Sequence, residues 1–241
     1  MMLPDRFSQT ALACLTMSEQ GSSQKLDLSK VYQFRFAGIS QEKKDATWAL
    51  ITRWIESRLE NPKSVLDPAA GRGEFIISSQ AQERWACDLS DQRISWPTGV
   101  TTRFGDIYKV DLPENYFDLI FVSNFLEHLA TPNDVYKYLM QLRKSLKPGG
   151  KLAIMGPNFR YCAKGYYDFA DHLLPLTHRT IEEHLAAAAL DHKSTISRFL
   201  PLSFRSQRLS HPLLVKLYLA VPIFWRLFGK QFFIVATKPA E

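Results

Sequence analysis

The chain has 241 residues and a formal net charge of +6, and 46% of its residues are hydrophobic. This length and composition allow one well-packed domain with appendages. Its three cysteines are odd in number and have no C-x-x-C spacing, which argues against a disulfide framework or a zinc site and favours a reducing compartment. Asp5 and Arg6 precede a short apolar run, unlike a signal peptide, so we expect a cytoplasmic protein.

The positive charge is concentrated at one end of the sequence. Residues 191–241 contain eight basic and two acidic side chains, so the net charge of residues 1–190 is zero. Two interpretations stay open. The basic end is a solvated face, or it attracts an anionic substrate, nucleic acid or a membrane surface.

Residues 1–60 are predicted to be an N-terminal helical extension that packs on the core. Hydrophobic residues recur at three- and four-residue spacing over 40–60, which indicates a helix, and Pro62 ends it. Residues 21–23, Gly-Ser-Ser, are predicted to be flexible. From residue 61, strands and helices alternate, and this alternation predicts a parallel sheet. The predicted strands are 64–67, 84–88, 100–104, 117–122, 151–155, 193–200 and 231–237, and the predicted helices are 73–81, 132–146 and 180–190.

Two longer segments interrupt this alternation. Residues 156–177 are rich in Tyr, Phe, Asp and His and follow a predicted strand, so we expect an active-site loop at the carboxyl edge of the sheet. Residues 202–230 form an apolar and basic insert that is too short and too charged to span a bilayer. A lid or buried helix, a subunit interface and a membrane-surface helix all fit this pattern.

The most informative turn follows the first predicted strand, at Asp67-Pro-Ala-Ala-Gly71-Arg-Gly73-Glu74. It differs from the dinucleotide fingerprint because residue 76 is Ile instead of the third glycine. The chain contains no P-loop sequence. Acids on both sides of the glycines are unfavourable for a pyrophosphate, and they favour a ligand with a cationic group.

Asp67-x-x-x-Gly71-x-Gly73 resembles motif I of class I S-adenosylmethionine (SAM)-dependent methyltransferases. Four further motifs of that family follow in order over residues 60–160. They are Trp85-Ala-Cys-Asp88, Phe104-Gly-Asp106-Ile107, Tyr116-Phe-Asp-Leu-Ile-Phe-Val-Ser-Asn124 and Leu146-Lys-Pro-Gly-Gly-Lys-Leu152.

This resemblance implies a Rossmann-like, doubly wound α/β fold with seven mostly parallel strands and an antiparallel last strand. It implies SAM as cofactor and S-adenosylhomocysteine as product. Asp88, 17 residues beyond Gly71, would bind the ribose hydroxyls, and Asp106 would face the adenine amine. The full set of implied cofactor-binding residues is Asp67, Ala69, Gly71, Gly73, Asp88, Leu89, Asp106, Ile107, Asn124 and Arg35, the last for the SAM carboxylate.

Two motifs that are missing from the chain argue against some classes of methyl acceptor. Residues 123–126 are Ser-Asn-Phe-Leu and not the Asn/Asp-Pro-Pro-aromatic motif of amino-methylases of DNA bases, and the chain has no Pro-Cys pair. We therefore expect a small-molecule or glycan-linked acceptor, and not nucleic acid. The chain also resembles a bacterial subgroup found beside sugar and polysaccharide genes, through Ser123–Leu129, Pro157–Tyr161, Asp168–His172, Arg198–Pro201 and Gly229–Gln231. We predict methylation of an oxygen in a sugar-containing or lipid-linked metabolite.

Two other functions stay open. The chain is a non-catalytic binding protein with this fold, or a membrane-surface enzyme acting on a polyprenyl-linked glycan. In the latter case residues 211–230 would contact the inner membrane face. A homodimer also fits the apolar insert.

Three histidines are candidates for a general base that deprotonates the acceptor: His128, His172 and His178. Asn124-x-x-Glu127-His128 resembles the Glu-x-x-Glu-His motif of quinone-pathway O-methyltransferases, which can bind a divalent metal. Because Asn replaces the first Glu, we predict no metal. The alternative role of His128 is to cap the following turn, and that of His172 and His178 is a hydrogen bond to a backbone carbonyl.

Overall fold

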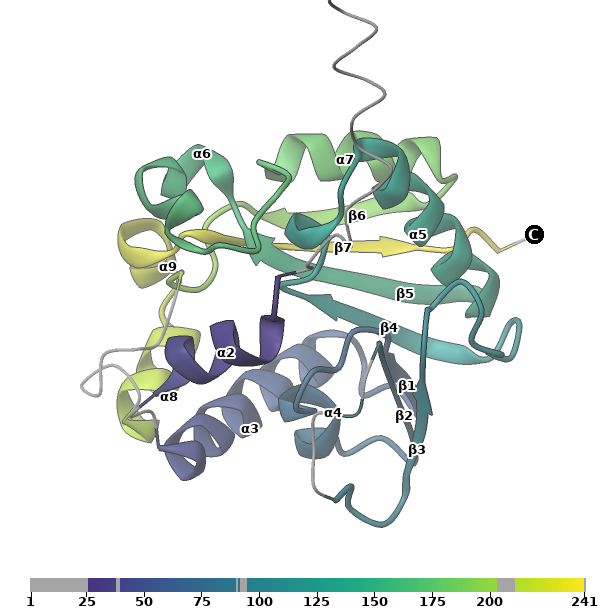
Figure 1. The fold of residues 1–241 in the computed structure, drawn as a ribbon. Coiled ribbons are helices and arrows are strands. Elements are labelled where there is room, and N and C mark those ends of the chain that lie inside the picture. Colours follow the sequence, from purple (N-terminus) through teal and green to yellow (C-terminus); the bar gives the residue numbers. More distant parts are fainter. Residues whose placement is uncertain (1–25, 38–39, 90, 92–94, 203–210, 241) are drawn as a thin grey trace, which may run out of the picture. The chain divides into compact units, whose positions relative to one another are not determined.

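The computed structural model describes residues 26–37, 40–89, 91, 95–202 and 211–240 (Figure 1). The chain divides into two compact units, one ending at Ala37 and one beginning at residue 38. The first contains helix α2 (Leu28–Phe36). The second contains every other described helix and strand. The predicted flexible residues 21–23 lie outside the described part of the chain.

Seven strands form one sheet in the order β3-β2-β1-β4-β5-β7-β6. Strands β1 to β5 run parallel to one another, and β7 runs antiparallel to both β5 and β6. This topology confirms the predicted fold class. The strands are β1 (Ser64–Asp67), β2 (Glu83–Asp88), β3 (Val100–Phe104), β4 (Phe117–Ser123), β5 (Leu146–Pro157), β6 (Asp191–Ile196) and β7 (Gln231–Thr237).

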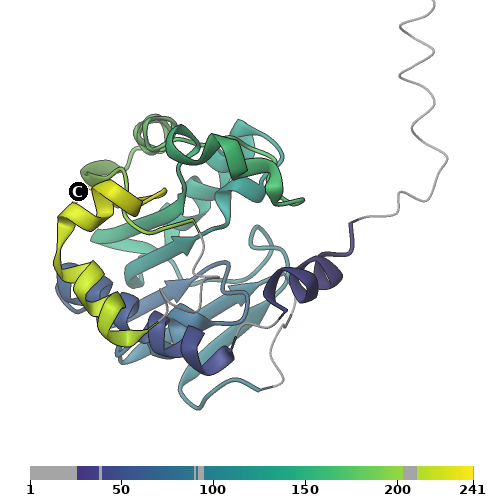
Figure 2. The same cartoon turned by 90° about the vertical axis from the view of Figure 1, so that its left-hand side faces the viewer.

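Helices cover both faces of the sheet (Figures 1 and 2). Alternate residues of β4 separate the two faces, because Ile120 packs in one hydrophobic cluster and Phe121 in the other. Helices α5 (Pro132–Ser145) and α7 (His178–Ala187) contribute to the first cluster. Helices α3 (Gln41–Arg58), α4 (Glu74–Ser78), α8 (Pro212–Ala220) and α9 (Pro222–Phe228) contribute to the second. Such three-layer packing buries strands on both sides, which explains their continuous apolar sequences.

Local sequence signals determine where the main helices begin. Thr131 caps α5 through a reciprocal capping box with Asp134, and Pro132 occupies the first turn. Thr177 caps α7 in the same way with Thr180, so this helix begins at His178, two residues before the predicted start. The buried Ile51 and Ile55 of α3 belong to the second cluster, so part of the predicted 1–60 extension packs on the core.

Three segments differ from their predicted form. Residues 156–177 are not a simple loop, because they contain α6 (Phe159–Cys162) and the 3₁₀ helix η2 (Ala163–Asp168). β6 ends at Ile196 and not at 200, because the backbone then turns to pair Phe199 N–H with the Gln231 carbonyl at 2.6 Å. The described part of the insert, residues 211–230, forms two short helices, α8 and α9, which are separated at Val221 because Pro222 begins α9.

Candidate active site

The carboxyl ends of four parallel strands bring the predicted cofactor residues to one edge of the sheet. Asp67 is the last residue of β1 and Asp88 the last of β2, while Asp106 lies two residues beyond β3. Asn124 directly follows β4, has a positive φ of 49°, and donates its N–H to the Met155 carbonyl at 2.8 Å. These side chains come from distant parts of the sequence and share this edge because the strands are parallel.

The glycine turn after β1 is joined to the end of β2. Gly71 donates its N–H to the Asp88 carboxylate at 2.7 Å, and Ala70 donates to the Cys87 carbonyl at 2.8 Å. Gly71 and Gly73 have φ values of 53° and 76°, a region that L side chains rarely adopt. A Cβ on Gly73 would lie 2.5 Å from the Trp96 ring, whereas one on Gly71 would meet nothing within 4 Å. The turn is therefore closely packed at Gly73 and open to a ligand at Gly71.

Asp67 is buried at the base of this turn. Burial raises the pKa of its carboxyl well above the usual range, and repulsion by Asp88 and Glu74 raises it further, while the Ala69 N–H lowers it. The Ala69 nitrogen lies 3.4 Å from Asp67 Oδ1. A cationic ligand group near this carboxyl would favour its charged form.

Glu74, the second acid of the turn, is paired with a lysine that sequence reasoning missed. Lys44 of α3 lies 2.5 Å from Glu74 Oε1, and both side chains are largely buried. The pair connects α3 to the first residue of α4. No local pattern indicated it, because the partners are 30 residues apart in the sequence.

The other predicted cofactor residues lie in varied surroundings. Asp106 Oδ1 accepts the Tyr108 N–H at 3.0 Å. Leu89, next to Asp88, is 75% exposed, and the half-buried Ile107 packs against the first hydrophobic cluster. Arg35 lies in the last turn of α2, in the first unit, so its role as a carboxylate ligand stays a prediction.

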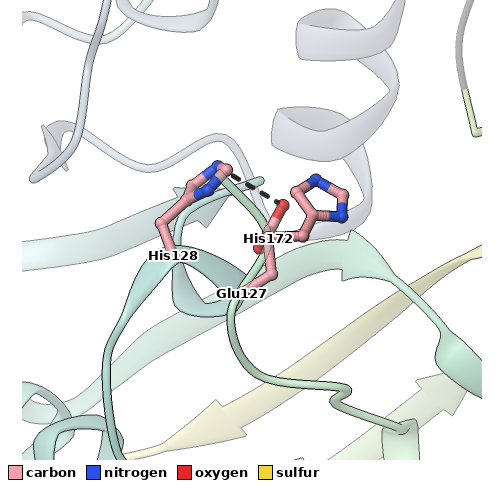
Figure 3. A group of neighbouring side chains, drawn as sticks. All are labelled: Glu127, His128 and His172. Atoms are coloured by element: carbon pink, nitrogen blue, oxygen red, sulfur yellow. Dashed lines mark ion pairs between the residues drawn. The ribbon is translucent and has the colours of Figure 1, made fainter. Parts of the chain in front are cut away.

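Two of the three predicted histidines meet beyond β4 and β5 (Figure 3). His128 ends the 3₁₀ helix η1 (Leu126–His128), and His172 lies in the 156–177 segment. Their rings are 5.3 Å apart in an edge-to-face arrangement. The side chain of the buried Glu127 lies between the two rings in Figure 3, and its Oε1 is 3.9 Å from His128 Nε2.

The tautomer of His128 follows from its partners. Its Nδ1 lies 2.8 Å from the backbone carbonyl of Asp171, which can only accept, so Nδ1 carries the proton. In the neutral ring Nε2 then has a lone pair. The Asp171 carboxylate is 3.6 Å from Nδ1, so the ring lies beside two carboxylates. With 22% of its side chain exposed, His128 is accessible to a reactant.

Aromatic packing fixes the segment that carries His172. Its ring stacks on Phe169 at 4.7 Å and contacts the buried Tyr166. The Leu173 and Leu174 amides donate to the Glu127 carbonyl at 2.8 and 3.1 Å. These contacts join the 156–177 segment to the turn that carries Glu127 and His128. Sequence reasoning missed the contribution of Asp171, since only the folded loop brings it to His128.

Glu127, His128 and His172 could also hold a metal ion. One ligand atom from each lies within 4.8 Å of the other two. A carboxylate with two imidazoles is a donor set that zinc and other divalent transition metals use. The predicted absence of a metal therefore stays a prediction.

His178 lies in a different environment. It is buried at the start of α7, where its Nδ1 is 3.0 Å from Asn158 Nδ2, and its ring stacks parallel to Tyr161. Asn158 also donates to the Ser197 carbonyl at 2.8 Å, so the amide nitrogen faces the ring and the Nδ1 lone pair is already used. Burial lowers the pKa of His178. These contacts connect α7 with the end of β5 and the segment after β6.

Comparisons with known proteins agree with this geometry. Residues 66–154 match the family model described as a methyltransferase domain. Among curated proteins, none matches the chain.

Solved structures show the same fold at low sequence identity. A SAM-dependent methyltransferase from Archaeoglobus fulgidus has a TM-score of 0.60 and 21% identity, covering 88% of this chain and 100% of that one. One from Mesorhizobium loti has a TM-score of 0.54 and 19% identity, covering 77% and 97%. The [4+2]-cyclase SpnF has a TM-score of 0.57 and 15% identity, covering 80% and 81%. Structural likeness at this identity shows the fold alone. Residues 66–154 thus match a methyltransferase domain, and most of the chain has the fold of SAM-dependent methyltransferases.

Proposed function

We propose that the chain is a SAM-dependent methyltransferase that methylates an oxygen of a small sugar-containing or lipid-linked acceptor, with His128 as the general base. The observation that carries the proposal is the pair of contacts made by His128. A backbone carbonyl holds Nδ1 protonated, and Glu127 lies beside Nε2. A hydroxyl is a weak nucleophile, so its methylation benefits from a base far more than that of an amine.

The residues at the strand ends suit SAM in chemical type. Asp88 would accept from the ribose hydroxyls and Asp106 from the adenine amine. The exposed Leu89 and the half-buried Ile107 would offer apolar contacts to the adenine ring. Asp67, Ala69, Gly71 and Gly73 would surround the methionine portion, with Asn124 beside it and Arg35 as a candidate for its carboxylate. The open space at Gly71 supports this arrangement.

SAM supplies a methyl group on a positively charged sulfur, which makes the leaving group a neutral thioether. The protein must then align the acceptor and remove one proton. His128 Nε2 takes the hydroxyl proton as the new oxygen–carbon bond forms, and Glu127 stabilises the resulting imidazolium. His172 acts as a positioning residue, because its ring packs against His128 and its loop carries Asp171.

The test has a binding arm and a transfer arm. Calorimetry should detect S-adenosylhomocysteine binding, and labelled SAM should transfer its methyl group to hydroxyl-bearing sugars or lipid-linked sugars in an acceptor panel. A binding protein without activity would bind the cofactor and label nothing. Label found on nitrogen, or activity that disappears with EDTA and returns with a divalent metal, would contradict a simple His base.

A further inference from the structure

Helices α8 and α9 present an apolar surface that the methyltransferase reaction does not explain. Five large hydrophobic side chains on these helices are 50% exposed or more: Leu213, Leu217, Ile223, Leu227 and Phe228. Leu214 is 47% exposed. Exposed apolar side chains at this density mark a protein or membrane contact and not an ordinary solvated face. We call these six residues the α8–α9 surface.

Both helices are held in place by their other faces. Val215 and Leu219 of α8 and Trp225 of α9 are buried in the second hydrophobic cluster. The Trp225 indole donates to the Tyr218 carbonyl at 2.7 Å, joining the two helices. The exposed side chains therefore belong to well-anchored helices, and their exposure does not come from a missing core contact.

The segment that carries this surface has charged side chains of one sign. Between His192 and Ala240 the sequence contains no aspartate or glutamate. Lys216 and Arg226 lie on the two helices and are exposed, and Lys230 follows α9. Large apolar side chains and several cations on one acid-free segment are complementary to a bilayer with anionic lipids.

The surface continues to the proposed acceptor side. A cavity of about 360 Å³ is lined by Phe228 and Lys230 from one side and by Gly165, Asp168 and Phe169 from the 156–177 segment. Phe169 stacks on His172. A membrane at the α8–α9 surface would therefore lie next to the segment whose Asp171 and His172 contact the proposed base.

We infer that the α8–α9 surface docks on an anionic lipid bilayer, with its leucines and Phe228 in the headgroup boundary and its cations toward lipid phosphates. The contact is peripheral, since in the described part of the chain no helix is long and apolar enough to cross a membrane. This inference stands apart from the identity of the acceptor, although it fits a lipid-linked one.

Cosedimentation with vesicles tests it, using the full chain and two vesicle types. Phosphatidylcholine with phosphatidylglycerol should carry down most of the protein, and phosphatidylcholine alone much less. The double variant Leu217→Gln/Leu227→Gln should bind the anionic vesicles at least about tenfold more weakly. Lys216→Glu/Arg226→Glu should weaken binding to anionic vesicles by a similar factor. The difference from wild type should be smaller at high salt, because screening already weakens vesicle binding by the wild-type protein.

A matched control separates local charge from net charge. Lys137→Glu/Lys144→Glu on α5 changes the net charge by the same amount at two exposed positions outside the surface. It should retain vesicle binding, and all variants should still bind S-adenosylhomocysteine, which keeps this test distinct from that of the proposed function. Equal sedimentation of surface and control variants would overturn the inference. So would a dimer, measured by light scattering, that the Leu217→Gln/Leu227→Gln variant converts to a monomer.

Discussion

The two sides of this site are built differently. On the cofactor side, Asp67 and Asp88 are the last residues of their strands, and Asp106 follows the next strand within two residues. On the acceptor side, His128 depends on Asp171, which lies 43 residues away in a segment of short helices. The cofactor side is thus determined strand by strand, and the acceptor side by contacts between segments.

The largest expected effect is on the acceptor side. His128→Ala should lower kcat by about 10²- to 10⁴-fold, the usual contribution of a positioned base. Binding of S-adenosylhomocysteine should stay within a few-fold of wild type, because the cofactor residues lie on other turns. Methyl-transfer assays with labelled SAM measure kcat, and calorimetry measures the binding of S-adenosylhomocysteine. His192→Ala, at a half-exposed histidine on β6, is the control, and equal losses in both variants would refute the assignment.

The next effect tests the cofactor side. Asp88→Ala should raise the Kd for S-adenosylhomocysteine by about 10- to 100-fold, since hydrogen bonds to a charged group contribute about 1.5–3 kcal/mol. It also removes the acceptor of the Gly71 N–H. Glu83→Ala, at the opposite end of the same strand, should leave the Kd unchanged. An unchanged Kd in Asp88→Ala would show that the ribose binds elsewhere.

The two glycines of the turn should differ in their effect on stability. Gly73→Ala should destabilise the fold by about 1–3 kcal/mol, because it combines a strained φ with a contact to Trp96. Gly71→Ala has only the backbone strain and should cost about 1 kcal/mol. Urea denaturation of both variants measures the difference. If Gly71→Ala were the more destabilising change, the open space beside Gly71 would not exist in solution.

The smallest effect is the pH dependence caused by Asp67. Because the folded state raises the pKa of this carboxyl above its unfolded value, the folded state holds the proton more tightly. This contribution to stability is present at low pH and is lost as the pH rises through the folded pKa. Melting temperatures of wild type should therefore fall more than those of Asp67→Asn as the pH increases above 4. Parallel pH profiles would show that Asp67 is not buried as described.

Much of the fold could be predicted because its signals are local. β1, β3 and β7 begin and end at the predicted residues, and the caps of α5 and α7 depend on residues three apart. The predicted element boundaries were wrong where long-range pairing determines them, as at the end of β6. The 156–177 segment was expected to be functional but not to contain α6 and η2.

The sequence alone determined the order of the acids and glycines at the strand ends, and with it the match of residues 66–154 to a methyltransferase domain, since each strand, turn and helix is encoded by residues close together in the chain. Only the tertiary structure decided which residues meet across distance. It paired Lys44 with Glu74 and His128 with Asp171, and it engaged His178 with Asn158. The physical reason is that a side chain's partners depend on how separate segments pack, and residue spacing along one chain does not contain that information.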